Sequence, residues 1–298
     1  MSDFGKPRAS TVAPRPPSTP ARSEGGIREF SFSSTDFERV RKLIYQHAGI
    51  SLSPVKQDMV YSRLARRLRA TGKGSFAEYL DALEKNGGDE WERFVNSLTT
   101  NLTSFFREPH HFPIFAEHLK KIGTTRPIRV WCSAASTGEE PYSIAITVQE
   151  ALGANVSNVS IIASDLDTNV LETARKGVYP IERVEKLSPE RLRRFFLRGT
   201  GAQEGYVSVR PELKRMIDFQ RINLLEPNWP VKGPLDIIFC RNVMIYFDKP
   251  TQYKILSRFA PMMQPDGLMF AGHSESFLHA ADLFKSLGKT VYALAKAR

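Results

Sequence analysis

The sequence predicts an α/β fold in which a small all-α domain precedes a doubly wound, mostly parallel sheet with a small antiparallel insert. Three patterns predict this fold. Short β-branched or aromatic runs alternate with long helical stretches after residue 125, as they do in parallel βαβ units. Apolar residues at helical spacing fill residues 28–100. Within residues 188–222, two neighbouring candidate strands have no crossover helix between them, which indicates antiparallel pairing.

Composition limits the class of protein. The chain has 298 residues, of which 41% are hydrophobic, so it can bury a substantial core. It contains no apolar run of about 18–20 residues that would span a membrane, and its first residues lack the apolar segment of a secretory signal. Cys132 and Cys240 are too few for a disulfide framework or a cysteine-built zinc site. We therefore expect a cytoplasmic protein with buried free thiols that is not an integral membrane protein.

The chain is basic, with 42 lysines and arginines against 32 aspartates and glutamates and a net charge of +10. This excess is spread thinly along the chain. It favours an anionic partner, but an acidic protein fits as well as a phosphate backbone. Charge alone therefore does not identify the partner.

The first hundred residues are predicted to form a tail and a helical domain. Residues 1–27 are rich in proline and poor in apolar anchors, which predicts a disordered tail. In residues 28–100, Thr35 and Glu38 match a capping box that opens the first of four helices. Residues 101–125 are expected to link this domain to the sheet domain at residues 126–298.

The sheet domain is predicted from four strands and the helices between them. The strands are Ile128–Cys132, Val159–Ala163, Leu235–Cys240 and Gly267–Ala271. Helical patterns cover residues 139–152, 168–176 and 250–262. The insert contains a basic helix that begins after Ser188, a glycine-rich turn, and the candidate strands Tyr206–Arg210 and Met216–Arg221.

The first candidate site follows the first strand. Six small residues, 133–138, separate this strand from a helix, so the backbone can approach a ligand at the carboxyl edge of the sheet. The segment does not match the glycine pattern that binds the pyrophosphate of a dinucleotide, so a dinucleotide ligand is disfavoured. Glu139 is expected to point its carboxylate into the crevice, where it suits an ammonium group. The alternative is an ordinary helix start with surface acids.

The second strand ends in Asp165, a position from which a carboxylate can accept hydrogen bonds from both ribose hydroxyls. A helix cap by Asp167 is the simpler interpretation, and both can hold together. The small-residue loop and the acid of the second strand favour an adenosine-type ligand without a pyrophosphate. S-adenosylmethionine fits, because its amino acid end carries an ammonium and a carboxylate.

Two further segments complete the candidate site. Arg241, Asn242 and Tyr246 follow the strand Leu235–Cys240 at the same sheet edge, where an arginine can bind a carboxylate in a fork. The alternative is a tyrosine packed under a loop. In residues 101–107, polar residues alternate with aromatics, which is typical of a linker that closes over a cofactor but also of an interdomain plug.

Four motifs in this order carry a resemblance to a known family. They read Asn-Leu-Thr-Ser-Phe-Phe-Arg, Ala-Ser-Thr-Gly-Glu-Glu-Pro-Tyr-Ser, Ala-Ser-Asp-Leu-Asp and Phe-Cys-Arg-Asn-Val-Met-Ile-Tyr-Phe. Over about residues 30–298 the chain resembles the chemotaxis receptor methyltransferases of bacteria, the CheR family. The resemblance implies a class I methyltransferase-like fold. It also implies methyl transfer from S-adenosylmethionine to glutamates of membrane chemoreceptors, which gives methyl esters and S-adenosylhomocysteine for sensory adaptation.

The resemblance also assigns site residues. It implies that Arg107 and Tyr246 are catalytic, with Tyr246 near the transferred methyl group. It implies contacts with S-adenosylmethionine from Asn101, Thr103, Arg107, Glu139, Asp165, Asn223, Leu224, Arg241 and Asn242. Whether Arg107, Arg241 or Tyr246 holds the substrate carboxylate stays open, since each can also hold the methionine carboxylate.

The chemistry of these residues agrees with ester formation. A glutamate with a pKa of about 4.3 is ionised at neutral pH, so attack on a sulfonium methyl needs alignment and no general base. The histidines are isolated, and we expect no metal. A nucleic-acid methyltransferase would favour a proline-containing loop after the last motif, and residues 242–246 have no proline. We therefore expect no nucleic-acid partner; a non-catalytic protein that binds S-adenosylmethionine is the third possibility.

Two surfaces are predicted to meet the receptor. Arg63, Arg66 and Arg67 lie opposite the apolar face of a helix over residues 54–71 and suit an acidic receptor helix, although a merely solvated face is the alternative. Three glycines, Gly199, Gly201 and Gly205, form a turn beside a candidate edge strand. The family resemblance implies that such a turn binds a receptor C-terminal peptide by strand addition, and a plain flexible turn is the alternative. We expect a monomer.

Overall fold

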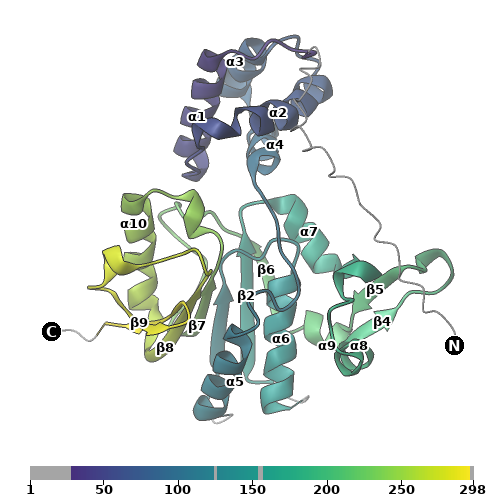
Figure 1. Cartoon of the computed structure of the whole chain (residues 1–298), viewed down its shortest axis with the longest axis vertical. Helices are drawn as coiled ribbons and strands as arrows, with labels where there is room; N and C mark the ends of the chain where they lie inside the picture. Colours follow the sequence, from purple (N-terminus) through teal and green to yellow (C-terminus); the bar gives the residue numbers. More distant parts are fainter. Residues whose placement is uncertain (1–27, 124–125, 154–156, 296–298) are drawn as a thin grey trace, which may run out of the picture.

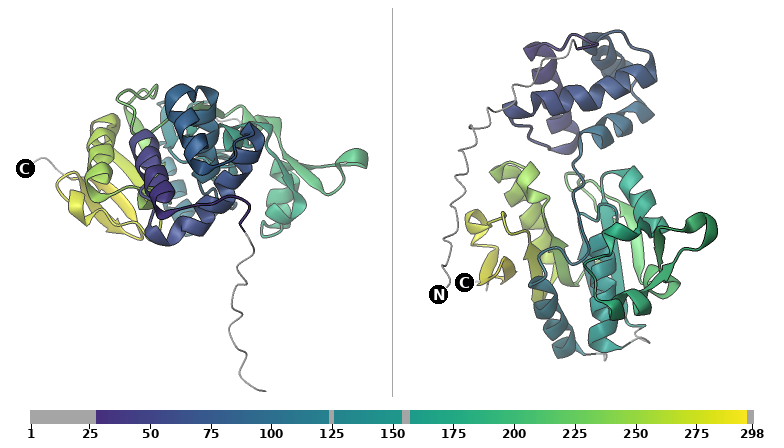
Figure 2. Two further views of the ribbon diagram at one scale, coloured as in Figure 1. Left: turned by 90° about the horizontal axis from the view of Figure 1, so that it is seen from above. Right: turned by 45° about the vertical axis from the view of Figure 1, so that its right-hand side comes forward.

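The computed structural model describes residues 28–123, 126–153 and 157–295, in which a helical domain lies across one end of a sheet domain (Figure 1). The predicted tail, residues 1–27, lies outside the described residues. No helix in the described part of the chain is long and apolar enough to cross a membrane. Seen from above, the helical domain covers the centre of the sheet domain, and the insert projects to one side (Figure 2).

The helical domain contains four α-helices and one 3₁₀ turn around a shared apolar core. The elements are α1 (Ser34–Ala48), η1 (Pro54–Lys56), α2 (Gln57–Thr71), α3 (Phe76–Asn86) and α4 (Asp89–Leu98). The predicted capping box of Thr35 and Glu38 is wrong, because Ser33 and Asp36 form it instead. Ser33 is the last extended residue, so its hydroxyl can accept from the Asp36 amide, whereas Thr35 already lies inside α1.

The sheet domain is built on seven strands in the order β6-β2-β1-β7-β8-β10-β9. The strands are β1 (Ile128–Cys132), β2 (Val159–Asp165), β6 (Ile217–Arg221), β7 (Leu235–Cys240), β8 (Met263–Ala271), β9 (Phe284–Gly288) and β10 (Val291–Leu294). The pairs among β6, β2, β1, β7 and β8 are parallel, and β10 pairs antiparallel with both of its neighbours. The strand order reverses between β1 and β7, and ligands of open α/β sheets bind at such a point.

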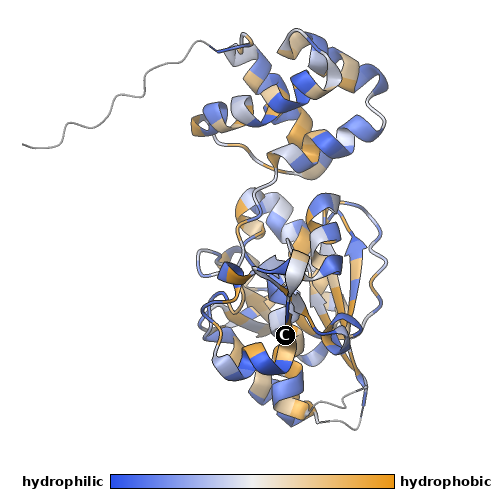
Figure 3. Ribbon diagram, turned by 90° about the vertical axis from the view of Figure 1, so that its right-hand side faces the viewer, coloured by the Kyte–Doolittle hydropathy of each residue, from blue (hydrophilic) through white to orange (hydrophobic). Residues whose placement is uncertain are grey.

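Helices cover both faces of this sheet, as the predicted doubly wound fold requires. α5 (His111–Ile122) and α6 (Glu139–Leu152) share a core with one face of β1, and α10 (Lys249–Phe259) shares a core with the other face. The strands are largely hydrophobic, whereas the outer faces of the helices are largely hydrophilic (Figure 3). α5 lies within the segment that was expected to be only a linker, and its apolar face packs on α6.

The insert differs from the prediction. It is an antiparallel sheet of β3 (Val178–Pro180), β5 (Tyr206–Val209) and β4 (Phe196–Arg198), in that order, with helix α8 (Pro189–Phe195). The expected insert strand Met216–Arg221 is instead β6, the parallel edge strand of the main sheet beside β2. The local pattern indicated a strand correctly, but short helix α9 (Pro211–Lys214) lets the chain leave the insert before β6 begins.

Candidate active site

A cavity of about 470 Å³ lies at the carboxyl ends of β1, β2 and β7, between the sheet and the helical domain. The loops that follow these three strands form one side of it. The linker after α4 and the segment between α1 and α2 form the other side. Because two domains contribute to its lining, the cavity exists only where they meet.

Nine of the predicted site residues line this cavity although they come from distant parts of the chain. They are Asn101, Thr103, Arg107, Asp165, Asn223, Leu224, Arg241, Asn242 and Tyr246. Parallel strands place their carboxyl ends at one sheet edge, and that topology explains why residues near 133, 165 and 241 meet. The linker then adds its polar residues from above.

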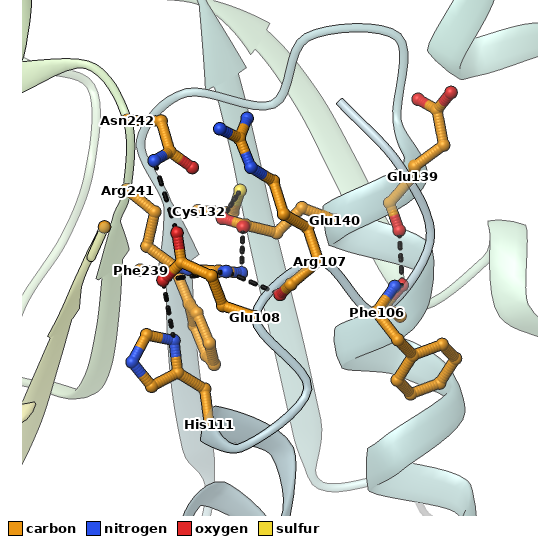
Figure 4. Close-up of polar contacts among 12 residues, drawn as sticks. Phe106, Arg107, Glu108, His111, Cys132, Glu139, Glu140, Phe239, Arg241 and Asn242 are labelled. Carbon is orange, nitrogen blue, oxygen red and sulfur yellow. Dashed lines mark hydrogen bonds and ion pairs between the residues drawn. The ribbon is translucent and has the colours of Figure 1, made fainter. Parts of the chain in front are cut away.

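Glu139 does not point into the cavity, and this prediction is corrected. Its carboxylate is fully buried, pairs with Arg183 of the insert and accepts from the Thr137 hydroxyl at 2.6 Å. The next residue, Glu140, lines the cavity instead, and Figure 4 shows the two carboxylates well apart. Both residues begin α6, where neighbouring side chains are turned by about 100° from each other. Sequence spacing alone could not select the correct one of the two.

The linker is irregular, yet its backbone carbonyls are held by side chains. Donors come from the helical domain, the insert, the strand loops and the linker itself. The pairs are Arg63 to Thr99 O at 2.5 Å, Tyr246 to Thr100 O at 3.3 Å, Ser136 to Asn101 O at 3.3 Å, Arg107 to Leu102 O at 2.7 Å and Arg183 to Thr103 O at 3.2 Å. Such bonds satisfy carbonyl groups that neither helix nor sheet can satisfy. The linker therefore both joins the domains and forms a fixed wall of the cavity.

Arg241 is tied to the protein interior. Its guanidinium is fully buried, pairs with Glu140, and donates to the carbonyl of Arg107 at 2.5 Å (Figure 4). Its Nη2 also lies 3.4 Å from Glu108 Oε2. Burial alone would raise the pKa of Glu108, but Arg241 and hydrogen bonds from His273 and Asn242 lower it to about 2. Arg241 thus fixes the end of the linker, and its fork is already occupied.

Asp165 lies at the end of β2 as predicted and lines the cavity. Its carboxylate accepts from the backbone amides of Ser136 at 2.8 Å and Asp167 at 3.0 Å. Burial raises the pKa of Asp165 to about 6, although these amides favour the ionised form. Asp167 caps α7 (Thr168–Lys176), and its other oxygen accepts from Asn101 Nδ2 at 2.9 Å.

Glu275 supports the site without lining the cavity, and the sequence analysis missed it. It is buried after β8, and its carboxylate accepts from the amides of Asn242 at 2.9 Å, Met244 at 2.8 Å and Gly272. These bonds hold the loop after β7, where Asn242 has a left-handed backbone with φ of 59°. The sequence did contain a signal for this residue, because Glu275, like Asp165, is an acidic residue near the end of a predicted strand.

The residues predicted to meet the receptor have different surroundings. Arg63 is bound to the linker, and Arg67 forms a two-bond pair with Glu90 at 2.9 and 2.6 Å. Only Arg66 of the three is exposed, and it has no ion pair with any described residue. Two of the three predicted arginines therefore already have partners within the enzyme. The three predicted glycines lie in the exposed turn between β4 and β5, where Gly201 and Gly205 have φ of 58° and 85°.

One group of side chains has the composition of a metal site. Ligand atoms of Glu108, His110 and His111 lie within 4.8 Å of one another. Arg241 Nη2 lies 3.4 Å from Oε2 of the Glu108 carboxylate. A positive charge at this distance opposes a cation. The donor set therefore fits a metal ion poorly.

Comparisons with known proteins match both parts of the chain. The family model described as "CheR methyltransferase, all-alpha domain" matches residues 35–99, and "CheR methyltransferase, SAM binding domain" matches residues 101–293. Chemotaxis protein methyltransferase 2 of Pseudomonas aeruginosa is 53% identical over 94% of this chain and 100% of its own length. The chemotaxis protein methyltransferase of Salmonella typhimurium is 55% identical over 90% of this chain and 93% of its own length. The chemotaxis protein methyltransferase of Escherichia coli is 54% identical over 89% of this chain and 93% of its own length.

Proposed function

Since the chain belongs to the CheR family of S-adenosylmethionine-dependent chemotaxis methyltransferases, we propose that it methylates glutamate side chains of chemoreceptors. The products are glutamate methyl esters and S-adenosylhomocysteine, and the reaction serves sensory adaptation. The observation that carries the proposal is the cavity at the carboxyl edge of the sheet. It gathers Arg107, Asp165 and Tyr246 from three distant segments.

The cavity fits S-adenosylmethionine. Asp165 offers a carboxylate at the tip of β2 for ribose hydroxyls, and the small residues after β1 allow close approach of a ligand to the backbone. When bound, the cofactor supplies a methyl group activated by its sulfonium. We expect Asn223 and Leu224, which line the cavity beside β6, to contact it as well.

Arg107 is the best candidate to hold the acceptor carboxylate. Its guanidinium lines the cavity, and the hydrogen bond it makes within the described residues goes to Leu102 of its own loop. Arg241, by contrast, is occupied by Glu140 and the carbonyl of Arg107. A planar guanidinium can align a carboxylate through two parallel hydrogen bonds. This alignment is the main catalytic contribution required, because the acceptor is already ionised.

Tyr246 is proposed to stay protonated and to lie near the methyl group, with its hydroxyl positioned by the linker backbone. Burial raises the pKa of Tyr246, and the hydroxyl donates to Thr100 O at 3.3 Å. In the transfer, an oxygen of the glutamate carboxylate forms a bond to the methyl carbon as the carbon–sulfur bond breaks. The electron pair of that bond goes to sulfur, which becomes neutral, so no proton moves.

The insert is proposed to bind a C-terminal receptor peptide. β4 is an edge strand of the small sheet. Val178, Leu197 and Tyr206, one from each strand, are 38–46% exposed. An edge strand beside exposed apolar side chains favours strand addition by an extended peptide. Tethering would raise the enzyme concentration near many receptor glutamates without altering the chemistry.

The proposal is tested by incubating the full chain with labelled S-adenosylmethionine and receptor membranes. We expect label on the receptor that mild base releases as methanol, as a carboxyl ester requires. Label on added nucleic acid would favour the rival enzyme class instead. Cofactor binding without transfer to any acceptor would favour a non-catalytic role.

A further inference from the structure

Arg107 lies between two residues with an unusual backbone conformation. Phe106 and Glu108 have φ of 52° and 53°, in the left-handed region where the Cβ atom of a residue other than glycine is crowded. Two such residues on either side of one position persist only where the surrounding structure holds them. We call residues 106–108 the arginine arch. Arg107 lines the cavity, whereas Phe106 and Glu108 do not.

The first end of the arginine arch is held by α6. The backbone amide of Phe106 donates to the hydroxyl of Ser143 at 2.9 Å, and Ser143 is fully buried. The Phe106 ring packs against Phe112 with 4.7 Å between the ring centroids, and the guanidinium of Arg191 lies 3.9 Å from the Phe106 centroid. This end cannot shift without leaving a buried hydroxyl unpaired.

The second end is held by the loops that follow β7 and β8. Glu108 Oε1 accepts from Asn242 Nδ2 at 3.3 Å and from the backbone amide of His273 at 3.2 Å. The other oxygen, Oε2, lies 3.4 Å from Arg241 Nη2 (Figure 4). Arg241 also donates to the carbonyl of Arg107 at 2.5 Å. The Glu108 carboxylate thus joins the arginine arch to the ends of two strands.

These contacts matter because the side chain of Arg107 can align a carboxylate only from a fixed starting point. Its hydrogen bond to the carbonyl of Leu102 at 2.7 Å orients the guanidinium, and the arginine arch fixes the Cα atom from which the side chain begins. Displacement of a reacting group by about 1 Å can slow an enzyme by about 100-fold.

We propose that Glu108 and Ser143 are positioning residues for methyl transfer, because they hold the backbone on either side of Arg107. Neither side chain lines the cavity, so each acts through Arg107. This inference rests on the proposed function, in which Arg107 aligns the acceptor carboxylate.

The experiment uses Glu108→Gln and Ser143→Ala in the full chain. Glu108→Gln keeps the size of the side chain and removes its charge, and Ser143→Ala removes the hydroxyl that accepts from Phe106. Initial methylation rates over a range of receptor-membrane concentrations give kcat and KM at a temperature where circular dichroism shows each variant folded. We expect kcat to fall at least fivefold in each variant. The receptor KM and the Kd of S-adenosylhomocysteine should stay within twofold, as they do when alignment is lost and binding is kept.

Matched controls change similar groups away from the arginine arch. Glu90→Gln alters a carboxylate that is paired with Arg67 through two hydrogen bonds in the helical domain. Thr147→Val removes a buried hydroxyl one turn further along α6, which donates to the carbonyl of Ser143. Neither Glu90 nor Thr147 lines the cavity, so both controls should keep kcat within twofold even where the melting temperature falls.

A merely structural role is separated from positioning in an Arg107→Lys background. Lysine cannot form the two parallel hydrogen bonds of a guanidinium, so little alignment remains to be lost there. In this background, Glu108→Gln and Ser143→Ala should each lower kcat by less than a further twofold. The same fivefold loss in this background would overturn the proposal, since the two residues would then act without Arg107.

Two results in the single variants would also overturn the proposal. One is an unchanged kcat in both, and the other is a rise in the Kd of S-adenosylhomocysteine as large as the fall in kcat, which would assign both residues to the cofactor site. Failure of the proposed function looks different, because the unsubstituted chain would then transfer no base-labile methyl group to receptors.

Discussion

Asp165 is the residue whose substitution tests the cofactor site most directly. Asp165→Ala should weaken S-adenosylmethionine binding at least tenfold, because charge-assisted hydrogen bonds to ribose contribute about 1.5–3 kcal/mol. Calorimetry on a variant with an unchanged circular dichroism spectrum measures this effect. Equal affinity in the two proteins would remove Asp165 from the site.

The same carboxylate predicts a pH dependence. Burial raises the pKa of Asp165 to about 6, so the group protonates at a higher pH than an ordinary aspartate. The ionised form is the one that accepts both ribose hydroxyls, and cofactor affinity should therefore fall as the pH drops through about 6. Calorimetry between pH 5 and 8 extends about one pH unit or more to each side of this pKa and measures the predicted fall in cofactor affinity. An Asp165→Asn variant should show a flatter profile, and an equally steep one would assign the effect to another group.

Glu275 is predicted to stabilise the loop after β7. Glu275→Gln replaces one acceptor oxygen by a donor that faces backbone amides of Asn242, Met244 or Gly272. Each buried group left without a partner costs about 1–3 kcal/mol, so the melting temperature should fall by several degrees. Thermal unfolding followed by calorimetry measures the change. Glu204→Gln, an exposed substitution in the insert turn, is the control and should leave the melting temperature unaltered.

At the scale of elements, two arginines of α2 are predicted to have different roles, one in receptor binding and one in stability, which the sequence could not distinguish. Arg66→Ala should slow receptor methylation and reduce its salt dependence, because Arg66 is exposed and has no ion pair among the described residues. Arg67→Ala should instead lower the melting temperature, because it leaves the half-buried Glu90 without its two-bond partner. Rates at low and high salt, together with thermal unfolding, compare the two variants. Identical behaviour of both would mean that α2 has a single role.

The elements also show what local sequence can and cannot predict. β1, β2 and β7 were predicted within two residues, because short apolar runs between turn residues determine buried parallel strands. β6 was recognised as a strand but placed in the wrong sheet, since its partner is β2, over fifty positions earlier in the chain. Local pattern carries no information about such a distant partner. Glu139 and Glu140 show the same limit at the site, because packing against Arg183 and Arg241 decides which carboxylate faces the cavity.

At the scale of the whole molecule, the insert and the cavity should behave as separate binding units. Deleting residues 199–205 should abolish binding of a receptor C-terminal peptide, because it removes the turn beside the edge strand β4. Cofactor affinity should be retained, since no residue between 199 and 205 lines the cavity. Titration of the peptide and of S-adenosylhomocysteine into both proteins tests the separation. If no such peptide binds the intact chain, the insert does not serve as a tether.

The position of the cavity between two domains has a consequence for biosynthesis. The ribosome completes the helical domain before β1 emerges, and the loop after β7 follows more than a hundred residues later. Domains that fold during synthesis generally do so from the N-terminus. The helical domain is therefore fully synthesised while the sheet domain that covers its cavity-facing apolar residues is still incomplete. Nascent chains that end before Tyr246 should have no measurable cofactor affinity, so the ligand can assist only the last stage of folding.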